Sequence, residues 1–288
     1  MRVEWTAPGG GIAKIAEVAG LARRCVKHDG GLPETASEGY LARRYTGDGV
    51  TAFGAYDDGL LVACGAVRPA GEARAMTGLV DPGHRGRGLG SGLLDRLIEA
   101  AGPSPLLKTE TESLTPEADE LFRSRGFAPA FAEDVFRHDA TLPLAPAPLP
   151  PGVRAEEWDD GNRDAFYAAY RASFAGRPGF PGWSRDQWID WLVDDGFRPD
   201  CSLVAYAGNG TPAGFVACAE GFLVQVGAVP EWRGRGIGRA LATAALERLR
   251  ARGATEVHLD VNVNNPASAA LFLSLGCTAI ARRARYER

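Results

Sequence analysis

Apolar positions recur along the chain with two kinds of spacing, and the same succession of spacings occurs twice. Helical spacing predicts helices in the first half near residues 12–27, 34–44 and 87–101, and in the second near 163–174, 185–193 and 235–250. Short apolar runs predict strands near residues 50–56, 60–68 and 73–80, and near 202–207, 214–220 and 222–228. A further strand, helix and final strand follow each long third helix. This alternation favours a mixed α/β sheet in each half.

The long third helix of each half begins at the same glycine-rich hexapeptide. The copies are Arg85-Gly-Arg-Gly-Leu-Gly90 and Arg233-Gly-Arg-Gly-Ile-Gly238, and each follows a predicted strand. A strand, a glycine turn and a helix leave backbone N–H groups unpaired at the positive end of the helix dipole, where pyrophosphate binds. The glycines let the backbone approach the phosphates, and the arginines add charged donors. Both halves are therefore predicted to hold a phosphorylated cofactor.

The context of these turns excludes two common nucleotide-binding motifs. No Gly-Lys-Ser/Thr of a Walker loop follows the glycines, and the spacing is not the G-x-G-x-x-G of a dinucleotide site. The pattern Val/Ala-x-Pro-x-x-Arg-x-x-Gly-x-Gly, which starts at Val80 and at Ala228, instead resembles the acetyl-CoA-binding motif of the GNAT acetyltransferase superfamily.

A second element of that family is partly present in the second half. The family pattern is a strand Leu-x-Val-x-x-x-Asn and then a helix with a tyrosine four residues before a closing Gly-Phe. Leu259, Val261 and Asn265 match the strand, whereas Phe272 stands at the tyrosine position and Cys277 at the closing phenylalanine.

The first half departs from this element on the strand side, although it keeps the closing pair Gly126-Phe127. Thr115 stands at the asparagine position, Phe122 at the tyrosine position, and a charged strand, Lys108-Thr-Glu-Thr-Glu112, replaces the apolar one. Cofactor binding needs only the turn, whereas catalysis also needs an oxyanion donor and an acceptor pocket. The second half is therefore the expected active domain. We expect up to two acetyl-CoA sites and a single productive one.

The resemblance implies two tandem GNAT-like domains, each a splayed mixed β-sheet flanked by helices, with pantetheine between the fourth and fifth strands. The repeat places the domains at residues 1–142 and 152–288. Residues 143–151 are proline-rich and are expected to form an extended linker.

The expected acetyl-CoA contacts lie along the same stretch of each half. In the second half they are Val226, Gly227, Ala228, Arg233, Gly234, Arg235, Gly236, Ile237, Gly238, Arg239, Asn265, Ser268 and Phe272. In the first half they are Gly78, Leu79, Val80, Arg85, Gly86, Arg87, Gly88, Leu89, Gly90 and Ser91. By the same resemblance, the backbone N–H groups of residues 226–228 bind the oxyanion and the pantetheine. Asn265 is expected to hold backbone or pantetheine amides, to be the N-cap of the helix that begins at Pro266, or both.

The chemistry of amine acetylation asks for a base and an acid. An alkylamine with a pKa near 10 must lose a proton before it attacks a thioester. Glu220, between the third and fourth strands, is the predicted base, with Asp260 or a water positioned by Gln225 as alternatives. Gly227 keeps a side chain out of the acyl path. Because Phe272 cannot protonate the departing thiolate, Tyr206 or Tyr286 is the candidate acid, unless the thiolate leaves unassisted.

Composition fits two globular domains and narrows the partners. The net charge of −4 gives no support to nucleic-acid binding. The five cysteines form no C-x-x-C pair and the four histidines have no ligand spacing, so no metal is expected. No apolar stretch reaches the length of a membrane span and Met1 to Trp5 does not resemble a signal peptide, so a cytoplasmic location is expected. A monomer or homodimer is expected.

The expected activity is transfer of acetyl from acetyl-CoA to the primary amine of a small molecule, similar to a mycothiol precursor or an antibiotic. The competing hypothesis, favoured by both missing tyrosines, is a catalytically weak or inactive acyl-CoA-binding module. The aromatic segment from Phe180 to Trp191 is either part of the acceptor pocket or core, and Trp188 is the residue that tests this.

Overall fold

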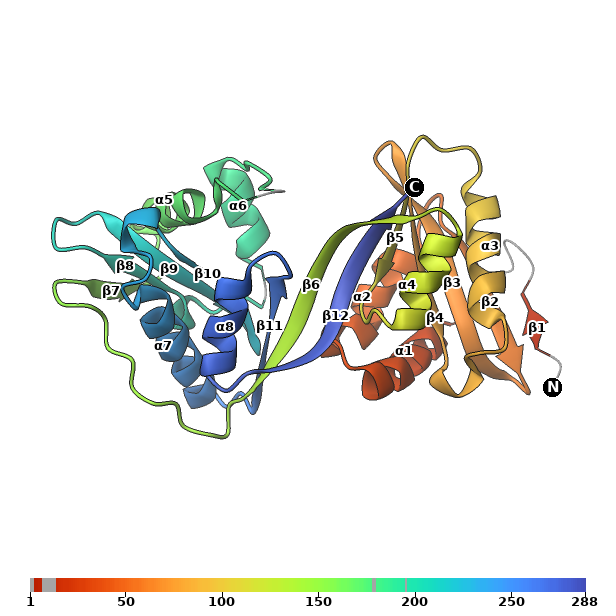
Figure 1. The fold of residues 1–288 in the computed structure, drawn as a ribbon, viewed down its shortest axis with the longest axis horizontal. Coiled ribbons are helices and arrows are strands. Elements are labelled where there is room, and N and C mark those ends of the chain that lie inside the picture. The colour runs from red at the N-terminus through yellow and green to blue at the C-terminus, as the bar shows by residue number, and fades with distance from the viewer. Residues whose placement is uncertain (1–2, 7–13, 178–179, 195) are drawn as a thin grey trace. The chain divides into compact units, whose positions relative to one another are not determined.

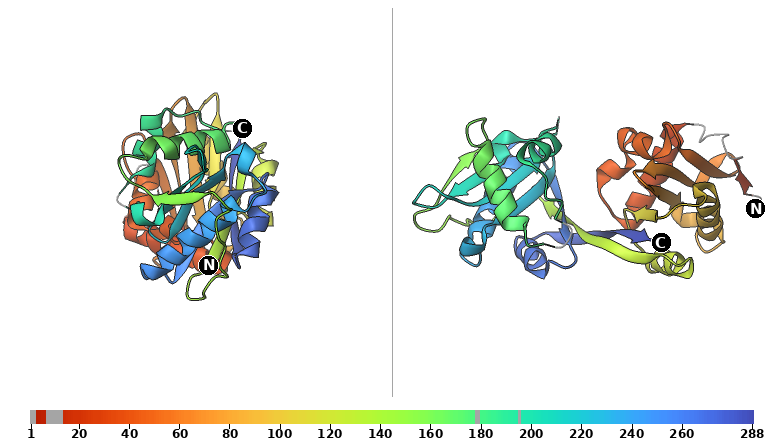
Figure 2. Two further views of the ribbon diagram at one scale, coloured as in Figure 1. Left: turned by 90° about the vertical axis from the view of Figure 1, so that its left-hand side faces the viewer. Right: turned by 90° about the horizontal axis from the view of Figure 1, so that it is seen from above.

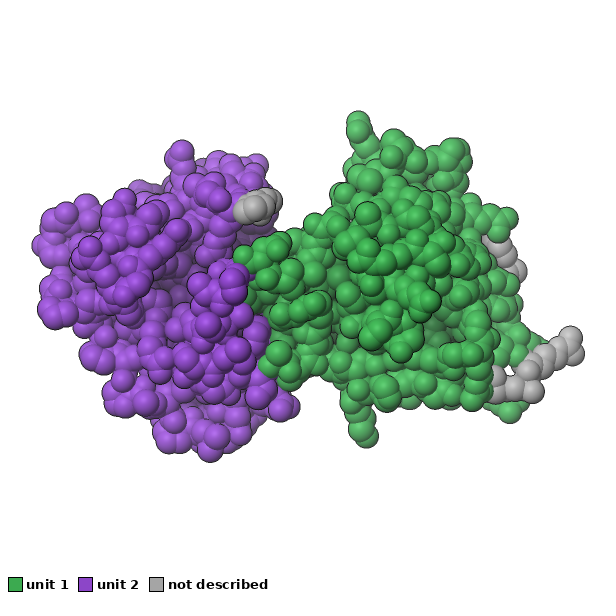
Figure 3. Space-filling view, viewed as in Figure 1, with its two compact units in different colours: residues 1–135, 261–264, 279–288 green, residues 136–260, 265–278 purple. Residues whose placement is uncertain are grey.

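The computed structural model describes residues 3–6, 14–177, 180–194 and 196–288. Two compact units, shown in different colours in Figure 3, divide the chain. Unit 1 comprises Met1–Val135, Val261–Asn264 and Ala279–Arg288, and unit 2 comprises Phe136–Asp260 and Asn265–Thr278. The C-terminal segment therefore belongs to the unit built mainly from the first half. The predicted sequence modules, 1–142 and 152–288, stay a prediction about the repeat.

Unit 1 is a mixed sheet with helices (Figure 1). Its strands are β1 (Glu4–Trp5), β2 (Thr51–Asp57), β3 (Leu60–Ala70), β4 (Ala73–Val80), β5 (Leu107–Thr111), the first part of β6 (Ala128–Asp139) and β12 (Thr278–Glu287). They lie in the order β1-β2-β3-β4-β5-β12-β6, with β4 and β5 parallel and β5 and β12 antiparallel. The helices are α1 (Ile15–Asp29), α2 (Glu38–Tyr45), α3 (Leu89–Ala101) and α4 (Pro116–Ser124), with short 3₁₀ turns η1 (Pro33–Ala36) and η2 (Pro82–His84).

Unit 2 repeats this plan. Its strands are the last part of β6, β7 (Arg154–Glu157), β8 (Leu203–Tyr206), β9 (Pro212–Ala219), β10 (Phe222–Ala228) and β11 (Glu256–Asn262), in the order β6-β11-β10-β9-β8-β7. The helices are α5 (Arg163–Phe174), α6 (Arg185–Leu192), α7 (Ile237–Ala251) and α8 (Pro266–Ser274), with 3₁₀ turns η3 (Pro199–Cys201) and η4 (Pro230–Trp232). In Figures 1 and 2, α5 and α7 cover opposite faces of these strands. A Cβ at Gly214 would meet Ile237 of α7, whereas the neighbouring Phe215 packs with α5.

Local sequence explains where these helices begin. Ser184 and Gln187 form a capping box at the start of α6, and Ser37 caps α2, which separates the predicted helix near 34–44 into η1 and α2. Both long third helices begin two residues later than predicted, because Gly88 and Gly236 adopt the left-handed conformation that ends the turn. Residues 12 and 13 of the first predicted helix lie outside the described residues.

The mixed α/β prediction is confirmed in both units. The core of unit 2 includes an aromatic cluster in which Trp188, 0 % exposed, stacks on Tyr170 with ring centroids 4.7 Å apart. Trp188 is thus a core residue. Within the described residues, no helix is long and apolar enough to cross a membrane.

Candidate active site

The glycine turn of unit 2 leaves the start of α7 open to a ligand. Gly234 and Gly236 have φ of +70° and +88°, a region that L side chains rarely adopt, and a Cβ at either would meet nothing within 4 Å. The glycines thus serve the turn conformation, with free space in front of them. No side chain caps the helix at Gly236, so the first N–H groups of α7 are available to an anion. The unit 1 turn has the same geometry, with φ of +73° at Gly86 and +80° at Gly88.

The fourth and fifth strands of unit 2 part almost at once. Strands β10 and β11 are parallel and share one residue pair, in which Phe222 lies opposite His258. The corresponding strands of unit 1, β4 and β5, keep four pairs, from Arg74 with Leu107 to Thr77 with Glu110. Residues 223–228 of β10 therefore present an open edge, which is longer than the open edge of β4.

A β-bulge interrupts β10 at the start of this open edge. The pairing of β10 with β9 shifts register between Leu223 and Gln225, whereas β4 pairs with β3 in an unbroken register. The N–H of Val229 donates to Ala213 O of β9 at 3.0 Å. Because successive residues point to alternate edges, the N–H of Gly227 also faces β9, and those of Val226 and Ala228 face the open edge. Two of the three predicted backbone donors thus face the open edge of β10, and their binding to a thioester stays a prediction.

Gly227 and Gln225 lie on the face of β10 that α5 and α6 cover. A Cβ on Gly227 would lie 2.7 Å from Ser173 Cβ and 2.9 Å from Phe215 Cε1, so close packing against α5 requires glycine here. Gln225 Oε1 accepts a hydrogen bond from Trp188 Nε1 at 3.1 Å. The core tryptophan therefore fixes the orientation of the Gln225 amide.

The two candidate bases are placed very differently. Glu220 is exposed in the turn that precedes β10 and pairs with Arg198 at 2.5 Å, roughly 20 Å along the strand from Gly227 at about 3.3 Å per residue. Asp260 lies on β11, two residues beyond the paired His258, and so on the same face as Phe222. Asp260 thus lies where the two strands separate.

Comparison with known proteins agrees with this geometry. The model of the "Acetyltransferase (GNAT) family" matches residues 162–277, and that of the "Acetyltransferase (GNAT) domain" matches residues 48–129. A mycothiol acetyltransferase of Thermobispora bispora is 32% identical over 283 residues, which are 94% of this chain and 95% of that protein. The chain belongs to the GNAT acetyltransferase family.

Solved structures show the same tandem fold. A GCN5-related N-acetyltransferase from Sphaerobacter thermophilus superimposes with a TM-score of 0.78 at 23% identity, covering 99% of this chain and 95% of that one. A tandem GNAT protein from the clavulanic acid biosynthesis pathway gives a TM-score of 0.64 at 17% identity, covering 100% and 98%. As a member of the GNAT family, the protein is an acetyl-CoA-dependent N-acetyltransferase.

Helix α8 of unit 2 packs beside the start of α7, where a Cβ at Gly238 would lie 3.7 Å from Leu271. Asn265 caps α8 through a hydrogen bond from the Ser268 N–H at 3.3 Å, which establishes the N-cap alternative. Phe272, 2 % exposed, is a core residue, and Arg239 of α7 donates to Ser274 Oγ at 2.7 Å. The N-terminus of α7 is therefore held against α8. The roles of Asn265, Ser268 and Phe272 in cofactor binding stay predictions.

The two candidate acids lie in different units. Tyr286 lies in unit 1, opposite Thr109 of β5, and its hydroxyl donates to Asp119 of α4. Burial, followed by the bond to Asp119, raises the pKa of Tyr286 to about 12. Tyr206 ends β8, and the Arg154 guanidinium lies 4.6 Å from the centre of its ring.

Acidic side chains surround the glycine turn of unit 1. Arg85 forms a two-pronged ion pair with Asp29, with Nη1 to Oδ1 at 2.7 Å and Nη2 to Oδ2 at 2.5 Å. His84 contacts Asp81 at 3.2 Å and Asp57 at 3.3 Å. In unit 2, Arg233 instead donates to backbone carbonyls, those of Ser173 at 3.0 Å and Ala228 at 3.4 Å.

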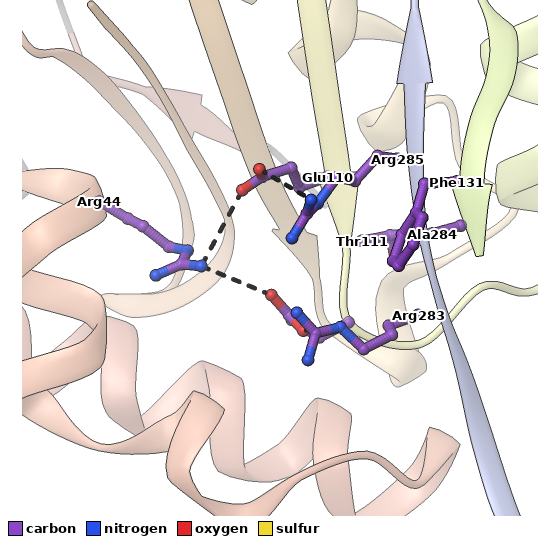
Figure 4. A pocket seen from close by; sticks show the side chains of 8 residues that line it. Arg44, Glu110, Thr111, Phe131, Arg283, Ala284 and Arg285 are labelled. Carbon is purple, nitrogen blue, oxygen red and sulfur yellow. Dashed lines mark ion pairs between the residues drawn. The ribbon is translucent and has the colours of Figure 1, made fainter. Parts of the chain in front are cut away.

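Ion pairs also fill the face of unit 1 that lies over the charged strand β5. Figure 4 shows Arg44 of α2 pointing at Glu110, with Arg283 and Arg285 of β12 nearby. Arg44 Nη2 lies 3.9 Å from Glu110 and 3.7 Å from Glu112. Arg285 lies 3.7 Å from Glu110 and Arg283 lies 3.8 Å from Glu112. The sequence showed that β5 is charged. It gave no signal that β12 supplies the partner arginines.

Proposed function

We propose that acetyl transfer takes place in unit 2, and that its acceptor is the amine of a mycothiol precursor. The early separation of β10 from β11, after one residue pair against four in unit 1, is the observation that carries the first part. An open edge with two inward backbone donors is what a thioester needs, both for entry and for stabilisation of the oxyanion.

Different residues of unit 2 bind the cofactor, orient the acceptor and take up the proton. Gly234, Gly236 and the start of α7 hold the phosphates of acetyl-CoA, which supplies the acetyl group as a thioester. The N–H groups of Val226 and Ala228 bind the carbonyl and the pantetheine. Gln225, held by Trp188, orients the acceptor or a water molecule. The proton leaves the amine for a carboxylate, and Glu220 and Asp260 are the candidates.

The acceptor proposal rests on the mycothiol acetyltransferase of T. bispora, which matches this chain over nearly its full length. We also propose a cytoplasmic location. All five cysteines are free and buried, as expected in a reducing compartment.

The acceptor is tested with the full chain, acetyl-CoA and a panel of amines, with each product followed by mass spectrometry. The mycothiol precursor should gain one acetyl group, and a sample already acetylated on its amine should gain none. Turnover of amino-antibiotics alone would contradict this acceptor while leaving the acetyltransferase activity in place.

A further inference from the structure

Two arginines of unit 2 converge on the end of α5. Arg177 follows the last turn of the helix, and its guanidinium carbon lies 4.0 Å from the centre of the Phe174 ring. Arg233, in the glycine turn, donates from Nη2 to the carbonyl of Ser173, the residue before Phe174, at 3.0 Å. Segments far apart in the sequence thus bring two positive charges to one helical turn.

Within the described residues, neither arginine has a carboxylate partner. The only hydrogen bonds that the Arg233 side chain makes there are to two backbone carbonyls, and the Arg177 guanidinium lies against an aromatic ring. Lost solvation against the Phe174 ring, followed by the positive charge of Arg233, lowers the pKa of Arg177, although both arginines keep exposed surface. The two neighbouring positive charges therefore repel each other, and an anion bound between them would remove that repulsion.

In unit 1, the carboxylate of one of the unit's own side chains is this anion. Arg85 stands in its turn where Arg233 stands in unit 2, and it also bonds the last residue of its strand, through Val80 O at 3.2 Å. At the end of α1, Arg85 meets the carboxylate of Asp29, whose side chain is only 8 % exposed. Near the end of the first helix of each unit, the turn arginine thus meets a carboxylate, Asp29, in unit 1 and a second arginine, Arg177, in unit 2.

We propose that Arg177 and Arg233 form an anion site that binds a phosphate group of the acetyl-CoA held by the adjacent turn. The inference rests on the proposal that unit 2 holds the productive cofactor. A phosphate accepts charge-assisted hydrogen bonds from both guanidinium groups, and Arg233 belongs to the same turn as Gly234 and Gly236. Either the pyrophosphate or the 3′-phosphate of CoA can meet this chemistry. Arg177 is then a cofactor-binding residue that the motif does not contain.

The test compares Arg177→Ala with Arg177→Lys and with the control Arg171→Ala, which removes an exposed arginine of the same helix. Calorimetry measures the Kd of acetyl-CoA and of acetyl-dephospho-CoA, which lacks the 3′-phosphate, at low and high salt. Arg177→Ala should raise the Kd for acetyl-CoA about 10-fold or more and flatten its salt dependence, as expected for a lost charged hydrogen bond. Arg177→Lys should recover part of the affinity, and Arg171→Ala should bind like the unchanged chain.

The two cofactors identify the phosphate group. If the loss caused by Arg177→Ala vanishes with acetyl-dephospho-CoA, the arginines bind the 3′-phosphate, and if it persists they bind the pyrophosphate. An unchanged Kd in Arg177→Ala, or a raised acceptor KM alone, overturns the inference. Gly236→Val separates this result from the proposed function. If Gly236→Val keeps full affinity and rate, the assignment of unit 2 itself fails.

Discussion

The two units share a glycine turn and differ in the charges and the strand pairing beside it. Both turns place two glycines at positive φ before an uncapped helix, and both tie the leading arginine to the last residue of the preceding strand. In unit 1 the turn is flanked by Asp29, Asp57 and Asp81, and β4 stays paired with β5. In unit 2 the turn is flanked by a second arginine, and β10 stands open.

This difference separates the features of a GNAT domain that the fold requires from the features that serve a ligand. The glycine turn connects a strand to a helix whether or not a ligand binds, so the fold by itself accounts for its presence in both units. The open edge and the uncompensated positive charge do not help the folded chain. Strand donors without a partner strand forgo the hydrogen bonds that pairing would supply, and like charges repel each other; a bound cofactor offsets both. Where those costly features persist, we place the chemistry.

Substitutions in the two glycine turns should distinguish the units most clearly. A double change of Gly236 and Gly238 to valine should lower acetyl transfer at least about 100-fold. A β-branched residue at the +88° φ of Gly236 is strained by about 1–3 kcal/mol, and its side chain fills the space for the phosphates. The matched change of Gly88 and Gly90 should leave most of the rate. The measurement is initial-rate release of the CoA thiol, with circular dichroism as the folding control. Equal losses from both folded variants would show that the two turns act together.

The base is tested with a pair of isosteric changes in unit 2. Asp260→Asn should lower kcat/KM by about 10²–10⁴-fold and remove the acidic limb of its pH profile, because Asp260 lies where β10 and β11 part. Glu220→Gln removes a carboxylate that pairs with Arg198 at the surface, where such pairs contribute about 0–1 kcal/mol, and should cost less than about fivefold. The reverse order of effects would establish Glu220, the residue that the sequence predicts, as the base.

Local pattern was enough to predict the helices that follow the two glycine turns. Helical spacing and the glycine hexapeptide locate α3 and α7 to within two residues, since a left-handed glycine fixes the start of each helix. The predicted bounds of α5 and β10 match those of the structure. These features depend on neighbours in the sequence, and so the sequence carries them.

The remaining features depend on contacts between distant segments. No periodicity indicates that β12 pairs with β5, or that Arg177 lies beside Arg233 after a separation of many residues. Trp188 illustrates the same limit. Its spacing suits either a core or a pocket, and the structure shows it buried on Tyr170 with its indole N–H on Gln225.

The smallest expected effect concerns the ion pair that distinguishes the unit 1 turn. Burial opposes ionisation of Asp29, but hydrogen bonds from Arg85 and His28 outweigh it and hold the pKa of Asp29 below its usual range. A carboxylate whose pKa is lowered by folding stabilises the folded state above its unfolded pKa, near 3.9, and this contribution is lost as the pH falls through the lower folded value. Asp29→Asn should therefore cost about 1–2 kcal/mol at pH 7, an amount reduced because Arg85 is partly exposed. Thermal unfolding of the variant and the unchanged chain at several pH values measures the difference. The gap between their Tm values should close below pH 3.9, and a gap that stays constant down to acidic pH would show that Asp29 stabilises unit 1 by packing alone.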